Sequence, residues 1–427
     1  MSGHEDFRLP PGWEEKSISQ VTIKTRQRDP RRTPHQKFRY VDVSSISREL
    51  FKITSPTELL GAEAPSRARK EIQENDVLFA TVRPTLRRIA IVPTELNGEI
   101  ASTGYCVLRS DLQQLDPRFL YFYLLTDHFN SRMAGLERGA SYPAVSDSDV
   151  TNSPIPLPPL PEQKAISHSL SAVQRAIEAQ ERIIQTTTEL KQALMQKLFS
   201  EGVRGEPQKE TEIGLVPESW EVVECGEICE TISVGIVVQP SSYYVKDGVP
   251  AFRSQNVRAD RIQVEPMVYI SKEANDGPVR KSKLSAGDVL IVRTGYPGTS
   301  CVVPLELEGS NCIDLIFARP DKSRLSSHYL SRFFNSDLAK RQVQAGKTGL
   351  AQQHYNVAAV KSTKIPLPSL GEQERIVSNL ELVDSKIETA TSRFNALQEL
   401  FYTLLRELMT AKMHTCNLRL SAAQLSC

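Results

Sequence analysis

A basic tract near the amino terminus holds side chains suited to contact an anionic polymer. Lys24–Arg39 reads KTRQRDPRRTPHQKFR, with seven Lys or Arg against one Asp. Such clusters bind phosphates, and arginine can also read the edge of guanine with two hydrogen bonds. A solvated surface loop is the alternative interpretation. The candidate DNA contacts from this tract are Arg26, Arg28, Arg31, Arg32 and Lys37.

Further polar segments suit contacts with phosphates or base edges. Thr81–Arg88 follows a predicted strand, and its glycine-rich counterpart Arg293–Thr299 would let the backbone approach a phosphate closely. Arg138–Tyr142 and Lys347–His354 carry hydroxyl and amide groups that suit base edges, and the segment around Arg253 is a weaker set. Plain turns, or loops packed on a helix start, explain these segments about as well. The candidates are Arg83, Arg87, Arg88, Ser141, Tyr142, Arg253, Asn256, Arg293, Thr294, Tyr296, Lys347, Gln352 and Gln353.

Motifs for catalysis or metal binding are absent from the sequence. It has no G-x-G-x-x-G loop and no Asn/Asp-Pro-Pro-aromatic motif of the kind with which adenine methyltransferases grip a flipped base. The histidines are isolated, and Cys225 and Cys229 form a lone C-x3-C without a second ligand pair. We therefore expect no catalytic residues, no metal and no cofactor in this chain.

The composition is that of a globular protein without a broad basic field. The 427 residues are 40% hydrophobic and 24% charged, and the formal net charge is +1. DNA binding would therefore rest on local patches. The start of the chain lacks an apolar signal-peptide core, and no run of 18 apolar residues occurs. We expect a cytoplasmic protein with reduced thiols.

The chain repeats itself about half a chain apart. Ile155–Gln163 reads IPLPPLPEQ, and 210 residues further on Ile365–Gln373 reads IPLPSLGEQ. The same offset aligns other positions, and Asp76-Val77-Leu78 matches Asp288-Val289-Leu290 with a small drift. In each copy, about 150 residues with short apolar, strand-like runs precede the proline-rich stretch. The chain is therefore predicted to contain two diverged copies of one α/β unit.

A helix of about 40 residues is predicted after each proline-rich stretch. IPLP holds the backbone extended, so the helices begin after it, near Pro161 and Leu370. Apolar residues then recur at alternating spacings of four and three, which is typical of a coiled coil. We expect the two helices to pair through Ile166, Leu170, Val173, Ile177, Ile184, Leu194, Leu198, Ile376, Leu380, Val383, Ile387, Phe394, Leu397, Phe401, Leu404 and Leu408.

This arrangement resembles the specificity subunit of type I restriction–modification enzymes. Besides the repeated IPLP-x-L-x-EQ stretch, Thr186–Glu206 looks like the conserved spacer of that family, and Gly214–Glu221 resembles the opening of its second recognition domain. The resemblance covers nearly the whole chain, from Pro11 to about Met413. The fold class that it implies is α+β, with two α/β target-recognition domains joined by two long antiparallel coiled-coil helices.

The resemblance also implies a division of labour. Each recognition domain would read one half of a split double-stranded DNA target. Two methylation subunits carrying S-adenosylmethionine, and restriction subunits, would assemble on the helices, and this chain would have no catalytic site. The expected segments are recognition domain 1 (1–154), spacer helix 1 (155–205), recognition domain 2 (206–364), helix 2 (365–413) and a tail (414–427).

Three other interpretations remain open at this stage. The chain could be the recognition subunit of a type II system with fused cleavage and methylation, which only neighbouring genes would distinguish. It could be a structural adaptor whose repeats bind protein, which predicts no salt-dependent affinity for DNA. A lone enzyme is disfavoured by the missing motifs. The target bases and the gap between half-sites cannot be read from this sequence.

Overall fold

The computed structural model describes residues 9–345, 355–410 and 412, which divide into two compact units. Unit 1 is drawn from Met1–Arg182 and Thr391–Cys427, and unit 2 is Ile183–Ala390. Each unit therefore contains part of both long helices, α4 (Leu160–Glu201) and α9 (Leu370–Met409).

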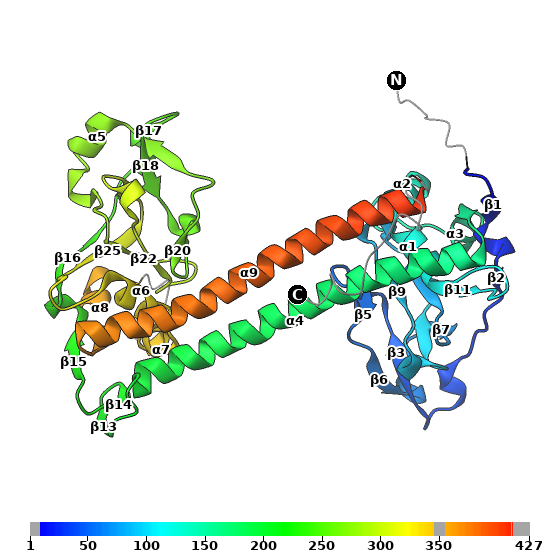
Figure 1. Cartoon of the computed structure of the whole chain (residues 1–427), viewed down its shortest axis with the longest axis horizontal. Coiled ribbons are helices and arrows are strands. Elements are labelled where there is room, and N and C mark those ends of the chain that lie inside the picture. Colours follow the sequence, from blue (N-terminus) through cyan, green and yellow to red (C-terminus); the bar gives the residue numbers. More distant parts are fainter. Residues whose placement is uncertain (1–8, 346–354, 411, 413–427) are drawn as a thin grey trace. The chain divides into compact units, whose positions relative to one another are not determined.

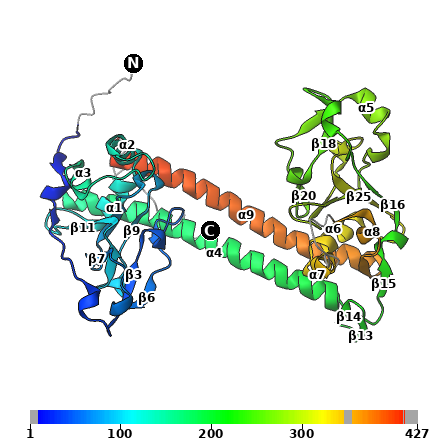
Figure 2. The ribbon, with the colours of Figure 1, turned by 180° about the vertical axis from the view of Figure 1, so that it is seen from behind.

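Unit 1 is built on two four-stranded sheets (Figures 1 and 2). The first has the order β2-β11-β8-β9, and its central strand β8 is completely buried because all four of its residues are apolar. The second has the order β6-β3-β10-β7, with β3 and β10 parallel. The strands are β2 (Thr22–Ile23), β3 (Lys37–Val41), β6 (Thr57–Leu60), β7 (Ala68–Glu71), β8 (Val77–Ala80), β9 (Ile89–Ile91), β10 (Ile100–Ser102) and β11 (Tyr105–Ser110).

Unit 2 repeats this plan. Its sheet β16-β25-β22-β23 has the same antiparallel order as the first sheet of unit 1, and β22 is again completely buried. In its other sheet, β17-β21-β18-β24, β18 and β24 form the parallel pair. The strands are β16 (Cys229–Val234), β17 (Tyr244–Val245), β18 (Val249–Phe252), β21 (Val268–Ile270), β22 (Val289–Val292), β23 (Ser300–Val302), β24 (Asn311–Cys312) and β25 (Leu315–Pro320).

Short helices and hairpins complete each unit. Unit 1 has α1 (Pro117–Leu125), α2 (Asp127–Leu136), α3 (Asp147–Thr151) and the hairpin β4 (Ile46–Ser47)–β5 (Lys52–Ile53). Unit 2 has α5 (Lys272–Asp276), α6 (Ser327–Asn335), α7 (Asp337–Ala345), α8 (Val357–Lys361) and the hairpins β13 (Gln208–Thr211)–β14 (Gly214–Pro217) and β19 (Val257–Arg258)–β20 (Arg261–Ile262). The buried apolar faces of α1 and α6 belong to the main cores of their units.

The repeated proline-rich stretch has the same structural role in both units. In unit 1, its IPLP part forms strand β12 (Pro154–Leu157), which pairs with β1 (Glu14–Ser17). In unit 2, the IPLP part forms β26 (Lys364–Leu367), which pairs with β15 (Glu221–Glu224). The glutamine of the EQ pair is then buried, and its amide nitrogen donates to two backbone carbonyls. Its amide oxygen accepts from the backbone N–H just before α1 or α6. Gln163 therefore fixes the start of α4 to unit 1, and Gln373 fixes the start of α9 to unit 2.

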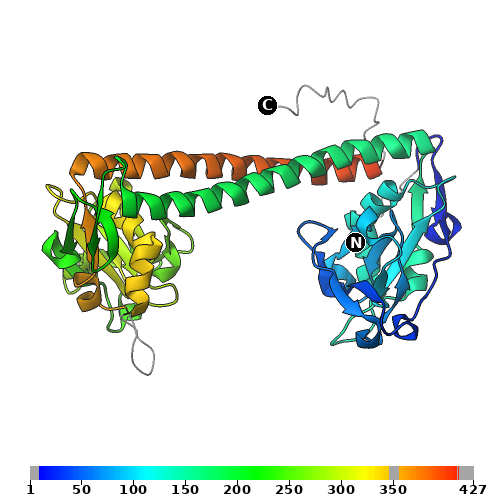
Figure 3. The same cartoon turned by 90° about the horizontal axis from the view of Figure 1, so that it is seen from below.

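The two long helices pack against each other within each unit (Figure 3). In unit 1, Ile166 and Leu170 near the start of α4 share a buried cluster with Phe401 and Leu408 near the end of α9. In unit 2, Leu198 near the end of α4 lies in one cluster with Ile376 near the start of α9. Because opposite ends meet in both units, the helices are antiparallel.

The predicted interface residues are buried to different degrees along the helices. Val173, Leu380, Val383 and Leu404 are buried, whereas Ile177, Ile184, Leu194, Ile387, Phe394 and Leu397 are half-buried. Glu372, in the first turn of α9, accepts a 3.2 Å hydrogen bond from the amide of Val203, just after α4, and lies 3.5 Å from the Arg204 guanidinium. In unit 2, polar contacts therefore join the first turn of α9 to the segment that follows α4.

Candidate nucleic-acid interface

In unit 1, two of the predicted contact segments form one surface. Val82, in the turn that follows β8, forms a β-bridge with Ala144, two residues after the second predicted segment. The Arg83 amide donates to the Pro143 carbonyl at 2.7 Å, and the Val145 amide donates to the Thr81 carbonyl at 2.9 Å. Backbone hydrogen bonds thus hold 81–88 and 138–145 side by side, although they are separated in sequence.

Side chains on this surface of unit 1 differ in their exposure and in their partners. Ser141 and Tyr142 are exposed, and the Arg83 guanidinium lies over the Tyr142 ring, 5.0 Å from its centroid. Arg87 instead forms an ion pair with Asp127 at 2.5 Å, and Arg138 forms two hydrogen bonds with Asp149 at 3.1 and 3.2 Å. Arg88 is half-buried, and its Nε has no hydrogen-bond partner among the described residues.

Unit 2 places its corresponding turn in the same way. Arg293 follows β22, and its carbonyl accepts from the Tyr355 amide at 3.2 Å. Tyr296 lies at the tip of this turn, between Gly295 and Gly298, and its side chain is 84% exposed. Both glycines have positive φ, a region that other residues rarely adopt, so the tip needs them. Thr294 is half-buried beside Arg293, and Lys347, Gln352 and Gln353 lie outside the described residues.

The basic tract is exposed, but part of its charge is neutralised. Lys37 forms an ion pair with Glu58 at 2.7 Å, and Arg31 lies 3.4 Å from Asp29. Arg28 donates through Nη2 to the Gly98 carbonyl. Arg26 and Arg32 are exposed. Gln27 of this tract forms a β-bridge with Lys70 of β7, and Lys70 forms an ion pair with Asp147 of α3. The tract and the start of α3 therefore belong to one side of unit 1.

One candidate must be withdrawn on structural grounds. Asn256 is fully buried, its Oδ1 accepts from the Arg253 amide, and its Nδ2 donates to the carbonyls of Gln263 and Pro266. Its side chain supports the 253–266 loop and cannot reach a ligand. Arg253 itself is half-buried. Sequence reasoning failed here because an amide that satisfies backbone groups has the same residue type as one that reads bases.

Two structural arginine–carboxylate pairs were missed in the sequence. Arg109 forms two 2.8 Å hydrogen bonds with Asp76, and Arg319 forms two of the same length with Asp288. Both carboxylates are buried, and each also accepts from a backbone amide three residues earlier. The repeated Asp-Val-Leu tripeptide was the available signal, since its aspartate recurs in both copies.

Within unit 2, a larger charged network joins α4 and α9 to α6 and to the β19–β20 hairpin. Arg332 of α6 lies 2.7 Å from Asp260 and 2.6 Å from Asp384 of α9, and Lys191 of α4 lies 2.6 Å from Asp384. Asp260 also accepts hydrogen bonds from Ser331 and Asn335. In the sequence, Lys191 only interrupts the apolar register of the helix, and nothing there indicates its ionic partner.

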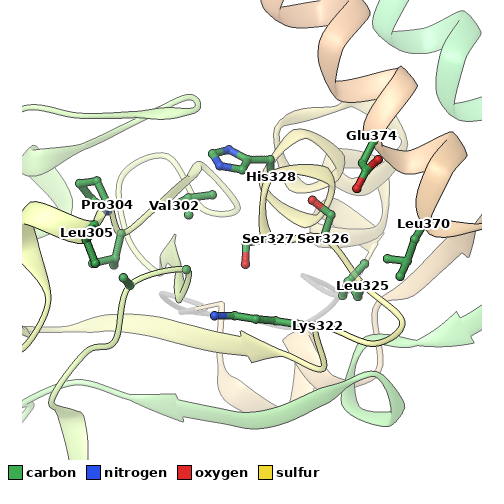
Figure 4. A pocket seen from close by; sticks show the side chains of 13 residues that line it. Val302, Pro304, Leu305, Lys322, Leu325, Ser326, Ser327, His328, Leu370 and Glu374 are labelled. Atoms are coloured by element: carbon green, nitrogen blue, oxygen red, sulfur yellow. The ribbon is translucent and has the colours of Figure 1, made fainter.

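A hollow in unit 2 offers no set of converging catalytic groups. It measures about 540 Å³ in unit 2, between β23, the start of α6 and the start of α9 (Figure 4). Its labelled ionisable residues, Lys322, His328 and Glu374, come from different walls. Across the described part of the chain, no group of three or more His, Cys, Asp or Glu could hold a metal ion. In the same residues, no helix is long and apolar enough to cross a bilayer.

Comparison with known proteins places this chain in a family. The model of the type I restriction modification DNA specificity domain matches twice, at residues 10–188 and 217–399. The MjaVIII specificity subunit of Methanocaldococcus jannaschii is 26% identical over 334 residues, covering 75% of this chain and 77% of the relative. The EcoBI specificity subunit of Escherichia coli is 22% identical over 335 residues, covering 71% and 70%.

Solved structures agree with this assignment. A chain from a study of complex assembly in a type I restriction–modification system is 32% identical, with a TM-score of 0.63, and the match covers 95% of this chain and all of that one. The S subunit from M. genitalium, at 15% identity and a TM-score of 0.55, shares the fold and covers 96% and 98%. The chain belongs to the specificity subunits of type I restriction–modification enzymes, the non-catalytic DNA-recognition components of these systems, and contains two repeated recognition domains.

Proposed function

We propose that each unit reads one half of a bipartite double-stranded DNA target through its paired loops. The observation that carries the proposal is the duplicated position of these loops. In both units an exposed turn after the buried central strand, β8 or β22, is hydrogen-bonded to the segment that leads to the IPLP strand. Exposed arginine, tyrosine and serine side chains on such loops have the chemistry needed to contact base edges and phosphates.

The basic tract of unit 1 would add phosphate contacts. Its exposed arginines lie on the side of unit 1 that also carries Lys70 and α3. Phosphate contacts fix the register of a protein on DNA, while base contacts select the sequence. With a net charge of +1, the chain depends on such local patches for its affinity.

We further propose that the helix pair is the docking surface for two methylation subunits. These subunits would carry S-adenosylmethionine, and restriction subunits would assemble on them in the cytoplasm. In unit 2, α4 exposes Ile183 and Leu190, seven residues apart and hence on one side of the helix. Both side chains are about half exposed, at 47% and 57%. Exposed apolar residues aligned on a helix are typical of a protein interface.

Co-expression with the neighbouring methylation and restriction genes tests both parts. Sequencing the modified adenines should reveal a motif of two half-sites separated by a fixed, unspecified gap. Replacing Ile183 and Leu190 together by Ser should reduce co-purification of the methylation subunit. Leu112→Ser, at an exposed apolar residue of unit 1 outside α4 and α9, is the control. A contiguous motif, or methylation-subunit binding unaffected by the helix changes, would contradict the proposal.

A further inference from the structure

Arg83 differs from Arg87 and Arg138, which lie in the same two loops of unit 1. Its guanidinium lies over the Tyr142 ring at 5.0 Å, within the range of an attractive cation–π contact. Arg87 and Arg138, from the same two loops, are paired with Asp127 and Asp149. Among the described residues, no hydrogen bond or ion pair involves the Arg83 guanidinium. It is therefore oriented by an aromatic face while its N–H groups stay available.

The backbone also holds Arg83 in a defined position. Its φ is +49°, in the left-handed region that L-residues avoid, and the buried Pro84 follows it. The 2.7 Å hydrogen bond from its amide to the Pro143 carbonyl fixes this conformation beside Tyr142. Unfavourable backbone conformations persist where the surroundings impose them, and they are concentrated at functional sites.

The repeat provides an internal comparison for this arginine. The turn after β22 in unit 2 also carries an arginine, but Arg293 occupies the position of Thr81, because the Tyr355 amide donates to the Arg293 carbonyl as the Val145 amide donates to that of Thr81. The Nη1 of Arg293 lies 2.5 Å from Asp314. Asp314 directly precedes β25, and the residue directly preceding the equivalent strand β11 is Gly104. Unit 1 thus lacks the carboxylate that neutralises the arginine in unit 2. The same turn carries a free, stacked arginine in one copy and an ion-paired arginine in the other.

We propose that Arg83 reads a guanine in the half-site recognised by unit 1, donating two hydrogen bonds to O6 and N7 in the major groove. A planar guanidinium held by an aromatic ring suits this directional contact with two parallel hydrogen bonds. Tyr142 is then a positioning residue. Arg293, held by Asp314, does not make the same contact in the other half-site. This inference rests on the proposed recognition function.

The test uses the chain in complex with its methylation subunit. Once the wild-type motif is known from sequencing, each base of the first half-site is varied in a duplex panel, and binding and methylation rates are measured. Wild type should prefer guanine at one position by roughly 5- to 150-fold. Arg83→Ala and Arg83→Lys should lose this preference at that position alone, because lysine cannot make the two parallel hydrogen bonds.

Changes at Tyr142 separate positioning from simple charge. Tyr142→Phe keeps the aromatic face and should keep the preference, whereas Tyr142→Leu should weaken it. Arg32→Ala, at an exposed arginine of the basic tract, should lower binding to all duplexes alike.

Three results would overturn the inference about Arg83. The first is an unchanged preference for guanine in Arg83→Ala, and the second is a first half-site without guanine. The third is an equal loss of affinity of Arg83→Ala for every duplex, together with a flatter salt dependence, which would indicate a phosphate contact. In each case, the recognition function would stand. A wild-type complex without any sequence preference would instead contradict the proposed function itself.

Discussion

Replacing Arg332 by Met should destabilise unit 2 strongly. The Arg332 side chain is only 8% exposed, and it neutralises Asp260 and Asp384, whose side chains are 10% and 26% exposed. Methionine is similar in length but uncharged. In this variant, Lys191 would be the one lysine or arginine of the described structure that remains within ion-pair distance of the two largely buried carboxylates. Removing one partner of a buried ion pair costs about 3–5 kcal/mol. Because Asp384 retains some access to water, we expect a loss of about 3 kcal/mol.

Lys191→Met should have a smaller effect. Asp384 would still have Arg332 at 2.6 Å, so we expect a loss of about 1–2 kcal/mol. In the repeat, Phe122 and Phe401 occupy the positions of Arg332 and Lys191, and their ring centroids are 6.1 Å apart. The same helix contact is therefore apolar in unit 1 and ionic in unit 2, and replacing Lys191 leaves unit 1 untouched.

Differential scanning calorimetry measures these losses. A loss of about 3 kcal/mol corresponds to a fall in Tm of roughly 6–12 °C for a unit of this size. Arg406→Met is the matched control, because this arginine of α9 forms an exposed ion pair with Glu407, and such pairs contribute about 0–1 kcal/mol. If Arg332→Met melted within about 1 °C of wild type, the network would not hold the helices to unit 2, and the reasoning from burial would be wrong.

Three further predictions concern the helices and the DNA contacts. Leu194→Asp and Phe401→Asp should each reduce folded yield or Tm, because both side chains pack in core clusters; unchanged melting in both variants would contradict the paired-helix account. Arg31→Ala with Arg32→Ala should weaken DNA binding, mostly at the first half-site, and lower the slope of log affinity against log salt by up to about 2; an unaltered titration would make this tract a solvated loop. Duplicating Thr187–Leu190 adds about 6 Å of helix, so sequencing of modified sites should find a gap longer by one or two base pairs, at about 3.4 Å each; an unchanged gap would show that α4 does not set the spacing.

The duplicated architecture could be predicted from the sequence because its signals are local and repeated. The apolar runs Val77–Ala80 and Val289–Val292 are the buried central strands. The first long helix, predicted to begin near Pro161 and to span about 40 residues, is α4, which begins at Leu160 and has 42 residues. Proline restricts its own backbone and that of the preceding residue, so the extended IPLP segment follows from residue type alone.

The roles of individual polar residues could not be predicted in the same way. Whether an arginine is free, stacked or ion-paired depends on partners far away in the sequence, as with Arg87 and Asp127 or Arg293 and Asp314. The buried position of Asn256 depends on the loop that folds over it. Lys191 interrupts an apolar register, and only the folded unit places Asp384 beside it.

The central claim is that each recognition domain reads its own half-site. The most direct measurement replaces residues 14–150 with the same segment of a related specificity subunit and maps the methylated adenines made by the resulting complex. We expect one half of the target to change to that of the donor protein, while the other half and the gap stay as they were. A swap that altered both halves would contradict independent reading by the two domains.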